Sequence, residues 1–410
     1  MNPLIQLTKA IPVSLVALIC IGLSPTSRAV TPPPDGGYPG FTTAEGQNAL
    51  LSLTTGSANT AVGWLSLKSN TDGSFNTAVG AGTLVLNIGD QAMGEGIENT
   101  AIGTAALLLN TTGSGNTATG VSALQGNTVG NGNTAVGFNA LPSNTTGSVN
   151  TAIGDAALLN NTTGGFNTAI GFATLINNTT INGIAGEFNT ANGYHALSSN
   201  TTGSNNTAIG NNALANNTTG INNTALGAGA GFNVTTANNT ICIGDISGAN
   251  VDSSCFIGNI RGVTTANADA IPVLIDSAGQ LGTTSSSRQF KKEIKPMDSA
   301  SETILALRPV TFHYKGDKTD TPQFGLIAEE VAEVNPDLVV RDRNGEIYTV
   351  RYDAVNAMLL NEFLKEHRKN EEQQATITRL DKQVEALTAG LQKVSAQLEV
   401  SKPAPQTVLK

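Results

Sequence analysis

Polar and apolar positions recur every seventeen residues through most of residues 42–245. The phrase Asn-Thr-Ala-x-Gly, with Val, Ile or Leu at most x positions, begins at ten asparagines: Asn59, Asn76, Asn99, Asn116, Asn133, Asn150, Asn167, Asn189, Asn206 and Asn223. Degenerate copies open at Thr42 and Asn239, and two longer spacings, of 23 and 22 residues, indicate insertions around 87–91 and 181–186. This register predicts a repeat architecture.

The length of the repeat and its turn residues predict a parallel β-solenoid, so the expected fold class is mainly β. A helical repeat unit needs two helices and more than about thirty residues. Gly and the Asn-Thr-Thr-Gly phrases are turn sequences, because Gly and Asn tolerate a positive φ. We predict one coil per repeat, with short Thr-Ala-Ile and Ala-Leu strands, Ile, Val and Leu inside, and ladders of Asn and Thr outside. Twelve such coils, at about 4.8 Å each, give a rod of about 60 Å.

A coil of this kind buries few side chains, one Ile or Val and one Leu per turn. It is too thin and too poor in aromatic residues to close a core alone, and its small Ala and Thr faces let another chain approach closely. The sequence therefore predicts that three chains share a core in a homotrimeric β-roll.

The repeat decays after Asp245, and residues 246–284 are expected to form a neck. Two short strands are predicted there, at 271–276 and 279–282, on either side of a turn. The Ser- and Thr-rich residues 283–287 read as a linker by composition.

Residues 285–354 predict a small α+β domain. Ser299, followed three residues later by Glu302, has the spacing of a capping box and predicts a helix at 302–307. Asn344-Gly345 predicts a hairpin turn. The other expected elements are a strand at 310–314, a helix at 326–334, and strands at 338–340 and 347–350.

A long helix is predicted from Asp353, and residues 355–400 carry a heptad pattern. Its apolar residues alternate in steps of three and four, which is the seam of a coiled coil: Ile377, Leu380, Val384, Leu387, Leu391, Val394 and Leu398. We expect a trimeric coiled coil; the alternative is a single amphipathic helix packed on its own domain. Residues 401–410 are a short tail.

The amino end has the three parts of a secretory signal peptide, predicted at residues 1–29 and followed by a linker at 30–41. Lys9 precedes an apolar run at 11–23, and Ser27-Arg28-Ala29 supplies a small-x-small cleavage site. The run is short for a membrane span, although an uncleaved anchor is the alternative. We therefore expect a secreted protein, extracellular or at the cell surface, with the periplasm as a further location.

After cleavage only Cys242 and Cys255 remain. Both cysteines lie in similar strand sequences, but Cys242 is two residues before its Gly and Cys255 is three residues before its Gly. On strands this one-residue offset puts the two sulfur atoms on opposite faces. A disulfide between them is not favoured, although an oxidising compartment permits one.

Charge divides the chain into two kinds of protein and excludes several functions. Residues 30–284 carry 2 cations and 12 acids, whereas residues 285–410 carry 18 cations and 19 acids. A net charge of −9 gives no electrostatic basis for binding nucleic acid. Three well-separated histidines argue against metal or triad chemistry, and no cofactor is expected.

The Asn-Thr-Ala-Ile-Gly phrases resemble the head repeats of trimeric autotransporter adhesins over about residues 42–245. This resemblance implies a trimeric left-handed parallel β-roll. The chain does not end in the translocator barrel of those adhesins, so no membrane anchor is expected after signal removal.

The residues after 285 resemble a second family, the intramolecular chaperone domain of endosialidases and other phage tail spikes, over about 285–370. The matching phrases are Ser286-Ser-Arg-Gln-Phe-Lys-Lys-Glu-Ile294, Leu307-Arg-Pro-Val-Thr-Phe312, Phe324-Gly-Leu-Ile-Ala-Glu-Glu-Val331, Asn335-Pro336 and Tyr348-Thr-Val-Arg-Tyr352. The family domain trimerises and helps the preceding β-rich shaft to fold, and many members then cut themselves off.

The resemblance places the nucleophile of that self-cleavage at Ser286 and its base at Lys291, with the Ser286–Ser287 bond as the bond cut. Many members have Asp after the serine, where this chain has Ser287. A neutral lysine can take the proton of a serine hydroxyl, and burial beside other cations favours the neutral amine. The enzyme activity implied is at most one self-cleavage per chain.

Two other functions compete with a self-cleaving fibre. One is a structural adhesin that trimerises and never cuts, with an unidentified cell-surface or glycan ligand. The other is a fibre that degrades glycans, which requires facing acids at glycosidase distance. The acids of residues 42–245 are sparse and out of register with the repeat.

Overall fold

The computed structural model describes residues 40–401 except 262, 267, 268, 277 and 343. The predicted signal peptide, almost all of the linker that follows it, and residues 402–410 of the tail lie outside the described residues. The chain divides into two compact units, Met1–Thr264 and Thr265–Lys410, and each is described by itself.

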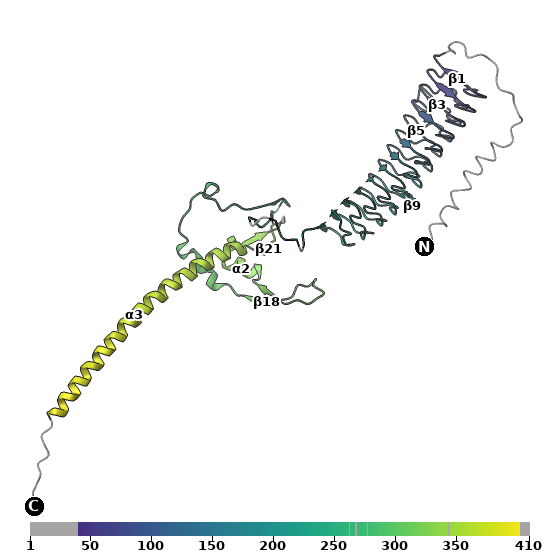
Figure 1. Ribbon diagram of the computed structural model, residues 1–410. Helices are drawn as coiled ribbons and strands as arrows, with labels where there is room; N and C mark the ends of the chain where they lie inside the picture. The colour runs from purple at the N-terminus through teal and green to yellow at the C-terminus, as the bar shows by residue number, and fades with distance from the viewer. Residues whose placement is uncertain (1–39, 262, 267–268, 277, 343, 402–410) are drawn as a thin grey trace, which may run out of the picture. The chain divides into compact units, whose positions relative to one another are not determined.

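The first unit is a parallel β-solenoid, as the seventeen-residue register predicts. Its thirteen-stranded sheet stacks one short strand per coil (Figure 1), with Thr paired to Thr and Ala to Ala in most neighbouring coils. The strands are β1 (Thr43–Glu45), β2 (Thr60–Val62), β3 (Thr77–Val79), β4 (Thr100–Ile102), β5 (Thr117–Thr119), β6 (Thr134–Val136), β7 (Thr151–Ile153), β8 (Thr168–Ile170), β11 (Thr190–Asn192), β12 (Thr207–Ile209), β13 (Thr224–Leu226), β14 (Ile241–Ile243) and β15 (Cys255–Ile257).

The core of the solenoid consists of alanine and leucine and closes within one chain. The central Ala of nearly every strand and the Leu of the following turn are fully buried, as for Ala135 and Leu141. The predicted Ala-Leu strand is wrong, because this Leu lies in a turn at positive φ, 55° at Leu141. Its N–H donates to the next coil instead, to Ala157 O at 2.9 Å. The expectation that a coil cannot close a core alone is therefore also wrong.

Asparagine ladders run through the interior rather than along the outside, which corrects the sequence prediction. The Asn that opens each phrase is fully buried and repeats one pattern: Asn133 Nδ2 donates to Asn116 Oδ1 at 3.1 Å, and Asn150 N–H donates to Asn133 Oδ1 at 2.9 Å. A second ladder joins Asn127 Nδ2 to Asn110 Oδ1 at 2.8 Å. Because each amide pairs with the same residue in the coils above and below, burial leaves its donors and acceptors satisfied.

The apolar residue at the x position faces outward, also contrary to prediction. Successive strand residues point to opposite faces, and the central Ala takes the inside. An exposed stripe of Val, Ile and Leu therefore follows the sheet, with Ile102 at 42% exposure and Leu226 at 48%. We call this surface the outer stripe: Val62, Ile102, Val136, Ile153, Ile209, Leu226, Ile243 and Ile257.

Both insertions are confirmed, and the sheet continues past Asp245 to β15. β9 (Thr180–Ile181) and β10 (Ile184–Ala185) form an antiparallel hairpin, and Asp90 bridges Glu95 in the other insertion. Pairing of β14 with β15 sets Cys242 opposite Phe256, so Cys242 is buried while Cys255 is exposed. The two sulfur atoms lie on different faces, as predicted, and both thiols are free.

The second unit is a small α+β region with a long helix. Its strands pair as three antiparallel hairpins, β16 with β17, β18 with β19 and β20 with β21. The elements are β16 (Leu274–Ile275), β17 (Leu281–Gly282), η2 (Arg288–Phe290), η3 (Asp298–Ala306), β18 (Val310–Phe312), β19 (Gln323–Gly325), α2 (Ala328–Val334), η4 (Pro336–Leu338), β20 (Val339–Arg341), β21 (Ile347–Val350) and α3 (Tyr352–Val400). The predicted capping box is wrong: η3 is a 3-10 helix whose N-cap, Met297, makes no side-chain cap.

The core of this unit is small, and α3 is almost entirely exposed. Five buried apolar residues form the core: Val331, Leu338, Val339, Val350 and Met358. Of the 49 residues in α3, Met358 alone is buried, and every member of the predicted seam is exposed. Among the described residues, no helix combines the length and the apolar composition needed to cross a bilayer.

Candidate functional site

A short 3-10 turn brings Ser286 and Lys291 together at the start of the second family resemblance. Ser287 is extended, with φ −62° and ψ 140°, and η2 follows it. The turn ends at Lys291, whose N–H donates to Arg288 O at 3.1 Å. Lys291 Nζ then donates to Ser286 Oγ at 2.9 Å. The two residues that the resemblance singles out are therefore within hydrogen-bond distance.

Both members of this pair are exposed in a single chain. A lysine amine accepts a hydroxyl proton only when it is neutral, and burial is a main cause of a neutral lysine. In the described residues of this chain the Lys291 side chain is exposed, so this cause is not met there. The described residues of this chain therefore do not desolvate the pair.

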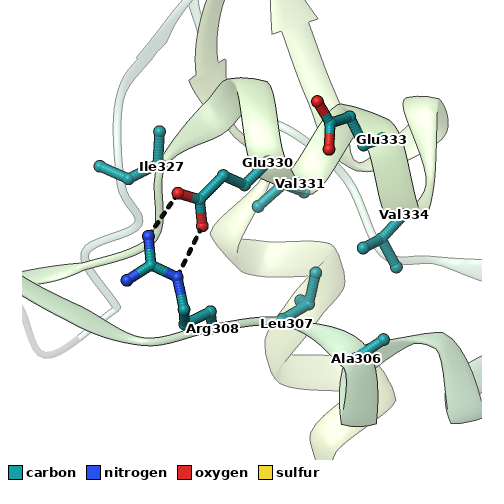
Figure 2. Close-up of a pocket in the computed structure, with 8 residues that line it drawn as sticks. All are labelled: Ala306, Leu307, Arg308, Ile327, Glu330, Val331, Glu333 and Val334. Carbon is teal, nitrogen blue, oxygen red and sulfur yellow. Dashed lines mark hydrogen bonds and ion pairs between the residues drawn. The ribbon is translucent and has the colours of Figure 1, made fainter.

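A pocket with a volume of about 260 Å³ lies between the end of η3 and α2. The apolar side chains of Leu307, Ile327, Val331 and Val334 line it together with charged residues. Figure 2 shows an ion pair at its edge, in which Arg308 Nε donates to Glu330 Oε2 at 3.1 Å and a second guanidinium nitrogen donates to Glu330 Oε1.

In this ion pair the charges of Arg308 and Glu330 neutralise each other. Hydrogen bonding and charge attraction to Glu330 raise the pKa of Arg308. Figure 2 shows Glu333 apart from the pair, on the next turn of α2. The exposed Glu333 carboxylate is therefore a second acid in the pocket lining.

A buried serine ties η3 to α3, and sequence reasoning missed it. Ser301 Oγ donates to the Glu362 carboxylate and accepts from Asn361 Nδ2 at 2.7 Å. Lys365 Nζ lies 2.7 Å from Glu362 and 3.2 Å from Glu302. Hydrogen bonds from Lys365 and then Ser301 lower the pKa of Glu362, and the same contact with Glu362 raises the pKa of Lys365.

We call Ser301, Glu302, Asn361, Glu362 and Lys365 the clamp. Its two halves are about sixty residues apart, so no local spacing marks it. The sequence predicted that Glu302 belongs to a capping box with Ser299, but in the structure Glu302 pairs with Lys365. The clamp fixes the segment after the serine–lysine pair against the long helix. In the described part of the chain, no three His, Cys, Asp or Glu side chains gather as metal ligands.

The comparisons with known proteins support the second resemblance. Residues 286–340 match the family described as "Chaperone of endosialidase". The match begins at Ser286 and includes Lys291, η3 and the pocket residues on α2. No match was found among curated proteins or among solved structures. The likeness of the repeats to adhesin heads therefore stays a prediction.

Proposed function

We propose that this protein is an exported homotrimeric fibre whose β-solenoid is folded with the help of its own carboxyl-terminal chaperone domain. The observation that carries the proposal is the chaperone match at 286–340 directly after a β-solenoid. Endosialidase-type chaperones, as the resemblance implies, serve such β-rich shafts. Residues 1–29 would supply the export signal.

Two unpartnered apolar surfaces support the trimer. The outer stripe is exposed along the solenoid, and the seam residues of α3 are exposed along the helix. Contiguous exposed apolar surface of this kind marks an interface. Parallel coiled-coil pairing of α3 would hold three chains in register, which raises their local concentration while the coils form.

We propose further that the domain releases itself by cutting the Ser286–Ser287 bond. Lys291 Nζ, once neutral, takes the proton of a serine hydroxyl, and the Oγ attacks the carbonyl carbon of residue 286. The amine of Ser287 takes up a proton and leaves, and water then hydrolyses the ester. An Oγ attacking the carbonyl of its own residue would close a strained four-membered ring, so the attack is made between copies.

Intact mass of the purified protein tests both processing steps. We expect the loss of residues 1–29 and two products that end at Ser286 and begin at Ser287. Ser286→Ala and Lys291→Ala should each give an uncut trimer, with Lys292→Ala as the matched control that still cuts. Fragments persisting in both variants would indicate an external protease, and an uncut wild-type trimer would identify a fibre that does not cleave.

A mixed trimer tests the route of attack. Tagged Ser286→Ala chains co-expressed with wild-type chains should be cut, because a neighbour supplies the hydroxyl. If tagged chains stay intact within mixed trimers, attack between copies is wrong.

A further inference from the structure

The basic segment 288–295 exposes two large apolar side chains that no described residue of the same chain covers. Phe290 is 68% exposed and Ile294 is 53% exposed. Four cations neighbour them in the sequence, Arg288, Lys291, Lys292 and Lys295, with Glu293 as the acid of the segment. An isolated exposed apolar residue is ordinary. An exposed aromatic ring within a basic segment, however, is complementary to an apolar pocket that carries acidic residues.

The pocket between η3 and α2 has the complementary properties. Its volume, about 260 Å³, lies below the roughly 300–1,000 Å³ of small-molecule sites and is of the order of one large side chain. Apolar side chains form part of its wall, and the exposed Glu333 carboxylate adds an acid to the lining beside the Arg308–Glu330 pair. An aromatic side chain flanked by cations fits these features.

The segment of the same chain is badly placed to enter this pocket. The chain enters η3 at Asp298 and reaches the pocket at the opposite end, Ala306. At about 2 Å per residue these ends are on the order of 15 Å apart, and the clamp holds η3 against α3. Phe290 would have to double back over this fixed turn.

A second copy in a parallel trimer supplies another route. Ser301 of η3 is held at Glu362 of α3, and the pocket lies at the other end of η3. Parallel α3 helices related by a three-fold axis would hold the segment and the pocket at the same heights in every copy. A neighbour's segment would then reach the pocket from outside the chain that forms it.

We propose that the pocket binds segment 288–295 of a second copy of this chain, with the Phe290 ring in the cavity and the lysines facing Glu333. This inference rests on the proposed trimer and deepens it. Phe290 lies between Ser286 and Lys291, so docking covers the serine–lysine pair with a neighbour's surface. The pair is then complete only in the assembled protein.

Cross-linking between distinguishable chains tests the contact. One chain carries Gln289→Cys, and the other carries Glu329→Cys, an exposed position on α2 outside the pocket lining, and a carboxyl-terminal size tag. Both have Cys20→Ala, Cys242→Ala and Cys255→Ser; Cys242 pairs with Ala225 in register, so alanine fits there. After co-expression and treatment with a short bismaleimide, we expect a product that joins one tagged to one untagged chain.

Variants at Phe290 make the result specific. Phe290→Asp should lower the yield of this product about tenfold or more, because a carboxylate replaces a buried ring at an acidic pocket. Phe290→Leu should keep the product. Phe324→Asp is the matched control: Phe324 is 81% exposed on β19 and does not line the pocket, so the yield should stay unchanged.

Sedimentation of the same samples separates this inference from the proposed function. A trimer that gives no tagged-to-untagged product, or a product that survives Phe290→Asp, overturns the docking and leaves the trimer standing. A product that forms only when both cysteines are on one chain identifies the chain's own segment as the occupant. A monomer overturns both.

Discussion

The two units of this chain obtain their stability in different ways. In the solenoid a single chain buries alanine, leucine and asparagine completely and repeats this core through thirteen strands. In the carboxyl-terminal unit five apolar residues form the core, and 49-residue α3 exposes its seam. The solenoid therefore closes its core within one chain, whereas the second unit leaves most of its apolar residues exposed in a single chain.

The difference also shows what a chaperone would contribute. Every coil pairs with residues about seventeen positions away, in parallel, and among the described residues β1 and β15 each pair on one side alone. Such non-local pairing is slow, and open edges invite aggregation before the stack is finished. A unit that is poorly packed alone but trimerises early can align three solenoids without adding to their cores.

Removing the second unit should have the largest effect. Expression of residues 1–284 should give aggregated repeats rather than soluble fibre, because nothing brings three solenoids together while they fold. Solubility and size-exclusion profiles measure this outcome, with the full chain as control. A soluble, heat-resistant trimer from the truncated chain would contradict the chaperone role.

Breaking the seam of α3 should remove the trimer while leaving each helix able to form. Leu387→Asp with Leu391→Asp puts charge into the predicted interface and should shift sedimentation equilibrium from trimer to monomer. Ala386→Asp with Ala389→Asp is the matched control on the other face of the helix, with the same added charge. Equal loss of trimer in both pairs would show that the seam is not the interface.

Interrupting one ladder should weaken the solenoid locally. Asn133→Leu removes the acceptor of the Asn150 N–H and the donor to Asn116 Oδ1 and Gly147 O. Buried groups left without partners cost roughly 1–3 kcal/mol each, so we expect a loss of roughly 2–5 kcal/mol, measured by denaturant unfolding. Asn211→Leu, at an exposed position, should change little. Similar losses in both would mean that the ladder adds no stability.

The sequence predicted the coil but not which side chains it buries. The seventeen-residue spacing determines the register, which is why the parallel stack is correct. Polarity suggested that asparagine lies outside, yet identical amides in adjacent coils satisfy one another. A usable signal was present: Asn opens ten phrases unchanged, whereas the x position varies to Thr119 and Asn192. An interior ladder needs identical residues, and an exposed stripe does not.

The site was predictable only where its residues are close in sequence. Ser286 and Lys291 are five residues apart, and one 3-10 turn joins them. The clamp and the pocket combine residues from separate elements, so their geometry depends on how η3 and α2 pack around α3. No periodicity or local motif encodes that packing.

The clamp should make the second unit sensitive to pH, the smallest effect expected. The pKa of Glu362 is lowered in the fold from its ordinary 4.5, so its contribution is present above that pH and is lost as pH falls through the folded pKa. The pKa of Lys365 is raised from 10.5, so its contribution is present below that pH and is lost as pH rises through the folded pKa.

Thermal unfolding followed by far-UV circular dichroism, which α3 dominates, should therefore show a stability loss on the acid side below about pH 4.5. Glu362→Gln should flatten this acid limb, because glutamine does not titrate. Glu366→Gln is the matched control, because Glu366 is exposed and its ion pair is with Lys369, at 3.6 Å, outside the clamp.

Ser301→Ala should lower stability at neutral pH by about 1–3 kcal/mol, because it deletes a hydrogen bond to a charged group. If Glu362→Gln keeps the full acid limb while Ser301→Ala is neutral, η3 is held to α3 by its apolar contacts and the clamp stabilises nothing.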